Sequence, residues 1–127
     1  MGVPEHFDGK AVYTVKIGAG SVSAADSCRA AVSFFSRLKG LLGTDSIPAG
    51  SALIISPCTG VHTFFMRYPI DVMLVGNQKV IAIYNSLKPF RMTTVHPLAE
   101  FVVELPAGTL AIIGAKTGDL VAIEEKP

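Results

Sequence analysis

The apolar segment IDVMLV at residues 70–75, closed by Gly76 and Asn77, constrains the fold more than any other stretch of this chain. It has the length of a β-strand and carries β-branched residues, which pack well on a pleated surface. The Gly-Asn pair tolerates the positive φ angles of a tight hairpin turn. Residues 79–84 resume an apolar pattern, so the two segments are predicted to form an antiparallel hairpin.

Other segments of strand length recur along the chain between turns that contain Gly or Pro. Strands are predicted at residues 11–17, 51–56, 99–105 and 119–124, with shorter extended pieces at 21–24, 87–91 and 92–95. Residues 109–113 fit either one helical turn or a strand. Because the strands follow one another at hairpin spacing, a doubly wound parallel sheet is disfavoured.

One helix is predicted at residues 29–39, with Asp26 or Ser27 as its N-cap. Apolar residues recur there at the three- and four-residue spacing of an amphipathic helix, so one stripe is expected to pack on the core. That stripe consists of Ala31, Phe34, Phe35, Leu38 and Leu42. Gly40 and Gly43 provide positions at which the helix can end.

Together these elements predict a mainly β fold, an antiparallel sandwich or barrel-like sheet with one packed α-helix. A chain of 127 residues is long enough for one core and too short for two ordinary domains. We therefore expect a single domain over residues 1–127, in which residues 1–10 form a flexible N-terminal segment.

Composition excludes several classes of protein. Half of the residues are hydrophobic and 17% are charged, which excludes intrinsic disorder. A formal net charge of +1 without clustered Lys and Arg predicts no nucleic-acid binding. The apolar runs are far shorter than the roughly 20 residues of a membrane-spanning helix, so no membrane span is expected. Residues 1–10 lack a signal peptide, which predicts a cytoplasmic location for the chain as given, and export only if a signal was removed.

Cys58, His62 and Met66 form a C-x3-H-x3-M pattern, which is similar to the soft ligands of a blue copper site. His62 and Met66 would lie about 13 Å apart in a strand, too far to share one ion, but about 6 Å apart in a helix. A turn would also bring them together. Such a site needs a second histidine, and nothing places His6 or His96 nearby. In the competing interpretation all three are core residues, and His62 donates to a backbone carbonyl.

A second chemistry open to Cys58 is nucleophilic attack, with His62 as the base. No third group that would orient the base is identifiable, and signatures such as H-E-x-x-H, C-x-x-C and G-x-S-x-G are absent. Cys28 and Cys58 are expected to be free thiols, because a scaffold that depends on disulfides is usually short and rich in cysteine.

Asp71 is a carboxylate inside an apolar strand, where it shares one face with Met73 and Val75. Unpaired burial of a carboxylate costs several kcal/mol, so Asp71 must be paired, hydrogen-bonded or neutralised. The candidate partners are Arg67, Arg91 and Arg37. Structural pairing is favoured over a site. If the pair opens to a cleft, the same groups could bind a polar ligand beside an aromatic wall of Phe64, Phe65 and Tyr68.

Five motifs occur in order along the chain. They are SRLKGLLG at 36–43, PCTGVHTFFMRYPIDVMLV at 57–75, LKPFR at 87–91, ELPAG at 104–108 and GD at 118–119. Through them, residues 27–123 resemble the bacterial and archaeal family known as domain of unknown function 192. The resemblance implies a compact β-rich domain with one helix packed on a sandwich or barrel-like sheet. It implies no activity, so no catalytic residue is carried over.

Two departures from the family pattern concern Phe90, where a Trp often precedes the arginine, and the Gly76-Asn77 turn, where an acidic turn is common. They affect one packing contact and one hairpin, and the expected fold stands. Some family members are exported, often with a shorter Trp-Met-Lys form of the central block. This chain carries the His-Thr form.

The sequence therefore predicts a non-enzymatic ligand-binding or accessory module, whose partner is an unknown small molecule or protein. The residues expected to line or support one depression beside the central strand are Cys58, His62, Met66, Arg67, Asp71 and Arg91. The alternative is a Cys/His-dependent hydrolase or a soft-metal-binding protein. No catalytic residue, metal or cofactor is assigned.

Overall fold

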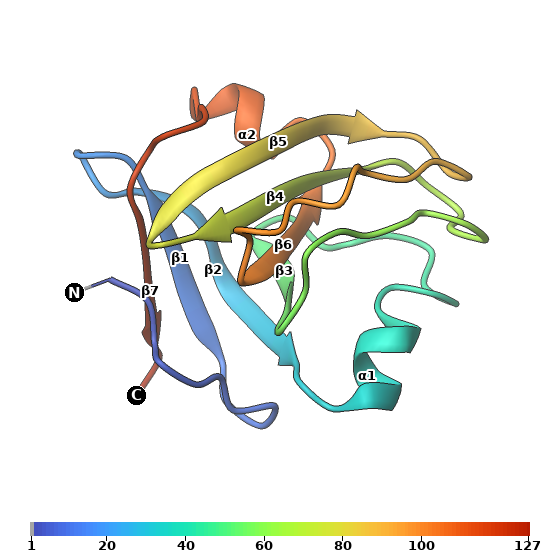
Figure 1. Ribbon diagram of the computed structural model, residues 1–127, viewed down its shortest axis with the longest axis horizontal. Helices are drawn as coiled ribbons and strands as arrows, with labels where there is room; N and C mark the ends of the chain where they lie inside the picture. The colour runs from blue at the N-terminus through green and yellow to red at the C-terminus, as the bar shows by residue number, and fades with distance from the viewer. Residues whose placement is uncertain (1) are drawn as a thin grey trace.

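The computed structural model describes residues 2–127, and over that range the chain forms seven strands and two short helices (Figure 1). The strands are β1 (Tyr13–Ile17), β2 (Val22–Ala31), β3 (Ser51–Ile55), β4 (Ile70–Gly76), β5 (Lys79–Leu87), β6 (Phe101–Pro106) and β7 (Val121–Glu125). The helices are α1 (Phe34–Lys39) and α2 (Thr109–Ile112). The predicted mainly β fold is confirmed, and residues 109–113 supply a helical turn instead of a strand.

All strands belong to one curled sheet with the order β5-β4-β6-β3-β2-β1-β7. Every neighbouring pair is antiparallel except β2 and β3, which are parallel and therefore need a crossover connection. Residues 32–50 form that connection and carry α1. The sheet curls until its two edges touch at one corner, where the Val121 amide donates to the Gln78 carbonyl at 2.9 Å.

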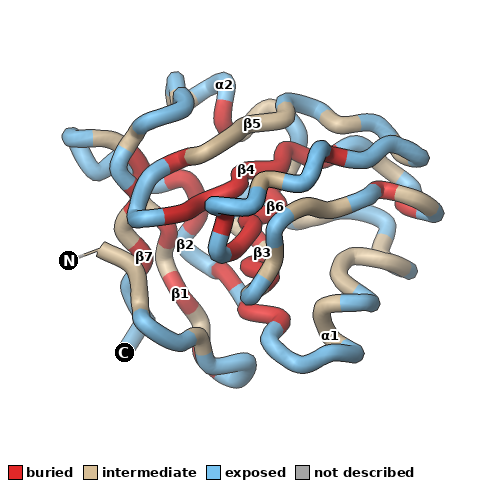
Figure 2. Tube along the Cα trace, viewed as in Figure 1, coloured by how far each residue is buried: buried red, intermediate tan, exposed pale blue. Residues whose placement is uncertain are grey.

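The alternation of side chains along each strand divides the interior into two hydrophobic clusters. On β4, Met73 and Val75 face the larger cluster with residues of β1, β2 and β7. Ile70, Val72 and Leu74 face the second cluster, which lies under the loops. Figure 2 shows that buried residues are concentrated along β4 and β6, which contribute to both clusters. The predicted division of β4 into two faces is confirmed.

The predicted helix at residues 29–39 is wrong in its first half, because β2 continues to Ala31. Neither Asp26 nor Ser27 is the N-cap. Ser33 has that role, and its hydroxyl accepts a hydrogen bond from the Ser36 amide at 3.1 Å. Residues 22–28 pair with β1 and residues 27–31 pair with β3, so the sheet overrides the helical pattern of the sequence.

The predicted packing of the helical stripe is also wrong, because α1 contains no buried residue. Phe34, Phe35 and Leu38 are 66%, 78% and 61% exposed. Of the predicted stripe, only Ala31 is buried, and it belongs to β2. The helix is only six residues long and stands away from the sheet (Figure 1).

The β4–β5 hairpin turns one residue later than predicted. Gly76 pairs with Lys79, and Asn77 and Gln78 adopt the positive φ angles of 51° and 61°. Gly76 is needed for a different reason, since a Cβ there would collide with the Leu98 carbonyl oxygen. That close approach holds the loop before β6 against the end of β4.

Met1 of the expected flexible segment 1–10 lies outside the described residues. Phe7, in the same segment, packs edge-on against Tyr13 and Phe101, with ring centroids 5.3 and 5.1 Å apart. Neither helix within residues 2–127 has the length and apolar character to cross a bilayer.

Candidate functional site

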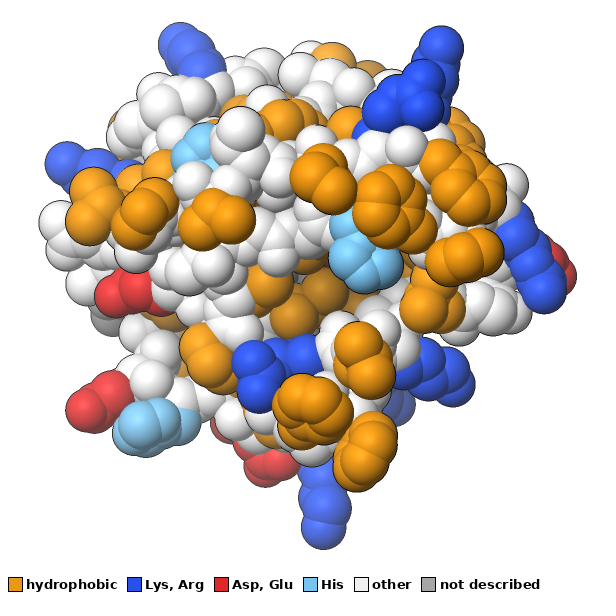
Figure 3. All heavy atoms as spheres, turned by 45° about the vertical axis from the view of Figure 1, so that its right-hand side comes forward, with side chains coloured by type: hydrophobic (Ala, Val, Ile, Leu, Met, Phe, Trp, Pro, Cys, Tyr) orange, Lys and Arg blue, Asp and Glu red, His pale blue; other side chains and the backbone are white. Residues whose placement is uncertain are grey.

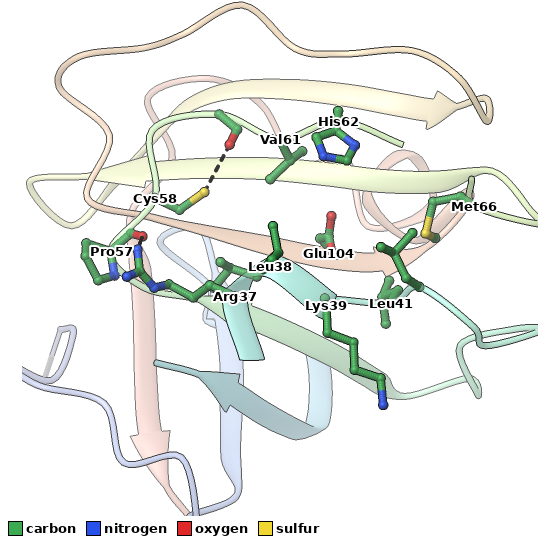
Figure 4. Close-up of a pocket in the computed structure, with 14 residues that line it drawn as sticks. Arg37, Leu38, Lys39, Leu41, Pro57, Cys58, Val61, His62, Met66 and Glu104 are labelled. Atoms are coloured by element: carbon green, nitrogen blue, oxygen red, sulfur yellow. Dashed lines mark hydrogen bonds between the residues drawn. The ribbon is translucent and has the colours of Figure 1, made fainter. Parts of the chain in front are cut away.

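A cavity of about 160 Å³ lies between the α1 segment and the sheet. Three parts of the chain form its walls: residues 37–42, residues 57–66 and the central strands β3 and β6. Its lining is mostly apolar and includes Leu38, Leu41, Val61 and Met66. Figure 4 shows these side chains around the opening, with Glu104 deeper inside.

Glu104 is the most unusual group in this cavity. Strand alternation places Val103 and Leu105 of β6 in the larger core, and Glu104 with Val102 on the opposite face. There Glu104 pairs with Leu53 of β3 and Val72 of β4 in the backbone register. It is 4% exposed and lines the cavity.

The carboxyl group of Glu104 has no protein partner within residues 2–127. No hydrogen bond or ion pair reaches it, and burial alone raises its pKa to about 7. A buried carboxyl is normally paired, because losing its hydration costs several kcal/mol. The cavity therefore contains a free hydrogen-bond acceptor at its floor.

Arg37 contributes a second unsatisfied polar atom. Its Nη1 donates to the Pro57 carbonyl at 3.1 Å, while its buried Nε has no partner among residues 2–127. In Figure 4 the guanidinium lies beside Pro57 and Cys58. Arg37 Nε is not exposed to the cavity, so a ligand there would meet apolar surfaces and the Glu104 acceptor on the floor.

Three of the predicted site residues, Cys58, His62 and Met66, line this cavity. The Cys58 thiol donates to the Gly60 carbonyl at 3.0 Å, and burial raises its pKa. The His62 ring stacks on Phe64, and its Nδ1 accepts from the Phe64 amide at 3.2 Å. A protonated thiol that is not bonded to the imidazole is a weak nucleophile, so this geometry does not favour a Cys/His hydrolase.

Of the two histidines considered as the second ligand of a copper site, His96 is bound elsewhere. His96 Nε2 hydrogen-bonds to the Tyr84 hydroxyl and to Thr94 Oγ1, each at 3.0 Å. In the part of the chain that the structure describes, no three His, Cys, Asp or Glu side chains are grouped as metal ligands. Both cysteines are free thiols, as predicted.

Asp71 is fully buried, but the expected arginine partner is wrong. Three backbone amides bind its carboxylate: Ser86 and Gly108 donate to Oδ1 at 2.8 and 3.1 Å, and Leu110 donates to Oδ2 at 2.9 Å. Ser86 lies in a bulge of β5, while Gly108 and Leu110 form the start of α2. Asp71 thus joins β4, β5 and α2 on the face opposite the cavity.

Arg67 and Arg91 also lie outside the cavity. Arg67 pairs with Asp45 at 2.6 Å on the surface, and Arg91 Nη1 donates to the Phe90 carbonyl at 3.3 Å. The six predicted residues therefore do not form one depression. The sequence reasoning missed Glu104 as a site residue, although strand alternation already placed this carboxylate on the same face as Val102.

Thr63 fixes the cavity wall formed by residues 57–66. Its buried hydroxyl donates to the Lys88 carbonyl at 2.6 Å and accepts from the Arg91 amide at 2.9 Å. These bonds join the segment to residues 88–98, which run beside it.

Replacing Thr63 by Val keeps the shape of the side chain and removes both hydrogen bonds. We expect the free energy of unfolding to fall by about 2 kcal/mol in urea denaturation, because a partly buried amide and a partly buried carbonyl lose their partner. Thr14→Val, which removes only an exposed 3.5 Å contact, is the control and should change stability by under about 0.5 kcal/mol. Equal stability of the two variants would contradict this role of Thr63.

Comparison with known proteins gives a family match over residues 15–123, to domain of unknown function 192, described as "Uncharacterized ACR". A relative named UPF0127 protein, from Thermococcus sibiricus, is 27% identical over 108 residues. The match covers 82% of this chain and 66% of the relative, so the chain spans just under two thirds of that protein.

Two solved structures share the fold. A protein of unknown function from Novosphingobium aromaticivorans superposes with a TM-score of 0.76 at 20% identity, covering 86% of this chain and 83% of that one. A protein from Sinorhizobium meliloti, provisionally described as a transcription regulator, gives a TM-score of 0.75 at 17% identity, with coverages of 94% and 98%. At these identities the likeness concerns the fold alone.

Proposed function

The chain belongs to the domain of unknown function 192 family, and we propose that it is a ligand-binding module. Its ligand would be a small, largely apolar molecule that carries a hydrogen-bond donor or a positive charge. The observation that supports this proposal is the Glu104 carboxyl, which is buried at the cavity floor without a partner in the described part of the chain. A group of that kind gains a hydrogen bond when a donor enters the cavity.

The size and lining of the cavity limit the ligand. A volume of about 160 Å³ resembles that of an apolar protein cavity that holds benzene, roughly 150 Å³. The apolar wall of Leu38, Leu41 and Val61 would accommodate the body of the ligand. Its donor group would meet Glu104.

Benzylamine and toluene are suitable probes, because they differ by the aminomethyl and methyl groups on the same ring. At pH 8 Glu104 is mostly ionised, since its pKa is about 7, and benzylamine is charged. We expect benzylamine to shift the NMR signals of Val61, Met66 and Glu104. Glu104→Gln should weaken benzylamine binding about tenfold, because a charge-assisted hydrogen bond is lost, and should leave toluene binding unchanged.

Glu100→Gln is the matched control, because Glu100 lies just before β6 and is exposed outside the cavity. It should leave the affinities for both probes unchanged. The proposed role of Glu104 is wrong if benzylamine binds equally well to the parent and to Glu104→Gln. It is also wrong if the shifted signals lie outside the cavity.

A further inference from the structure

The mouth of the cavity lies between two exposed apolar ridges. The first, the α1 ridge, consists of Phe34, Phe35 and Leu38. The second, the loop ridge, consists of Phe65, Phe90 and Met92, which are 75%, 55% and 62% exposed. Figure 3 shows both ridges on one face of the molecule, with a hollow between them.

Specific contacts hold the loop ridge in place. The rings of Phe65 and Phe90 lie 5.6 Å apart, edge to face. A backbone bridge between His62 and Met92 and the buried Thr63 hydroxyl hold the two loops side by side. Phe65 and Phe90 also have positive φ angles, 65° and 60°, which are strained for bulky residues. The fold thus maintains strained backbone at two phenylalanines that contribute little to its own core.

Charge is distributed unevenly around the same ridges. Residues 32–47, 61–69 and 87–98 carry five of the eleven Lys and Arg residues and only one of the ten Asp and Glu residues. The five are Arg37, Lys39, Arg67, Lys88 and Arg91. The one acid, Asp45, is paired with Arg67. This face is therefore basic, although the whole chain has a formal net charge of only +1.

We propose that this face docks on the surface of an anionic lipid bilayer, with the two ridges in the interface and the cavity mouth toward the lipid. Exposed aromatic and aliphatic side chains can enter the boundary between headgroups and acyl chains, while neighbouring Lys and Arg side chains are attracted to anionic headgroups. Single-stranded nucleic acid would use the basic charge and the aromatic rings, but Leu38 and Met92 offer it no stacking surface. The ridges protrude on both sides of a hollow, which suits a deformable interface better than a flat protein partner.

Co-sedimentation of the full chain with vesicles tests this proposal. We expect binding to vesicles of 70% phosphatidylcholine and 30% phosphatidylglycerol, and at least tenfold weaker binding to pure phosphatidylcholine or in 0.5 M NaCl. Phe34→Ser/Phe35→Ser and Phe65→Ser/Phe90→Ser should each reduce the partition coefficient at least tenfold. Lys88→Gln/Arg91→Gln should reduce it by a similar factor.

The control is Ile112→Ser/Leu120→Ser, which removes exposed apolar side chains away from both ridges. It should bind like the parent, and so should Glu104→Gln, since docking does not depend on the cavity carboxyl. Circular dichroism verifies that each variant is folded. The proposal is overturned if the parent does not bind anionic vesicles or if the ridge variants bind as well as the control. Ridge-dependent binding of a single-stranded oligonucleotide or ridge-dependent dimerisation, without vesicle binding, also overturns it.

Discussion

Asp71→Asn is expected to lower the free energy of unfolding by about 3–5 kcal/mol. The Asp71 carboxylate accepts three backbone N–H bonds in a fully buried position, and an amide has only one oxygen with which to replace it. Its NH2 group would face at least one backbone donor and leave that donor unsatisfied. Each buried unsatisfied group costs about 1–3 kcal/mol, and the loss of charge weakens the remaining bonds.

Urea denaturation monitored by circular dichroism measures this loss. Asp8→Asn is the matched control, since the exposed Asp8 carboxylate accepts one bond from the Lys10 amide at 2.8 Å. It should lower stability by less than about 1 kcal/mol. Amide hydrogen exchange of Ser86, Gly108 and Leu110 should accelerate more in Asp71→Asn than exchange elsewhere in the sheet. If Asp71→Asn unfolds like the parent, the three amide bonds do not hold this part of the fold together.

The second large effect concerns pH. Burial raises the pKa of Glu104 from 4.5 to about 7, so the folded state binds its proton more tightly than the unfolded state. The stabilisation that comes from this tighter binding of the Glu104 proton is fully present below pH 4.5. It is lost as the pH rises through 7. At roughly 1.4 kcal/mol per pKa unit, the loss amounts to about 3 kcal/mol, and Glu104→Gln should not show it.

The measurement is the difference in unfolding free energy between Glu104→Gln and the parent, from urea denaturation between pH 4 and pH 8.5. Other groups titrate equally in both proteins, so the difference isolates Glu104. It should grow by about 3 kcal/mol in favour of Glu104→Gln as the pH rises. Glu100→Gln should follow the parent curve. Parallel curves for Glu104→Gln and the parent would show that Glu104 is solvated or paired in solution.

Asp71 and Glu104 show which features of the site the sequence predicts and which it does not. Asp71 attracted attention because it interrupts an apolar strand, and its burial follows from that pattern. The partners of Asp71 were not predictable from that pattern. Arginine is the obvious partner for a carboxylate, but in the structure backbone amides from a β5 bulge and from the start of α2 bind it. The burial of Glu104 follows from the same two-residue alternation. The cavity around it does not, because its walls are formed by α1 and by residues 57–66, which are distant in the sequence.

The helix prediction failed for a related reason. The pattern of residues 29–39 is compatible with an amphipathic helix, and a single sequence does not reveal that residues 29–31 will pair with residues 53–55 of β3. Once those pairs form, Ala30 and Ala31 belong to the sheet, and only six residues remain helical. Phe34, Phe35 and Leu38 then face solvent, where they form part of the proposed docking face.

The sequence by itself determined the strands other than β2, most of their boundaries and the two faces of β4, because these depend on side-chain alternation and turn residues only a few positions apart. The tertiary structure alone decided which polar groups meet. Ser86, Gly108 and Leu110 lie 15, 37 and 39 residues from Asp71, and the cavity combines three separate stretches of chain. Such contacts depend on the order in which strands pair across the sheet, which local patterns do not specify.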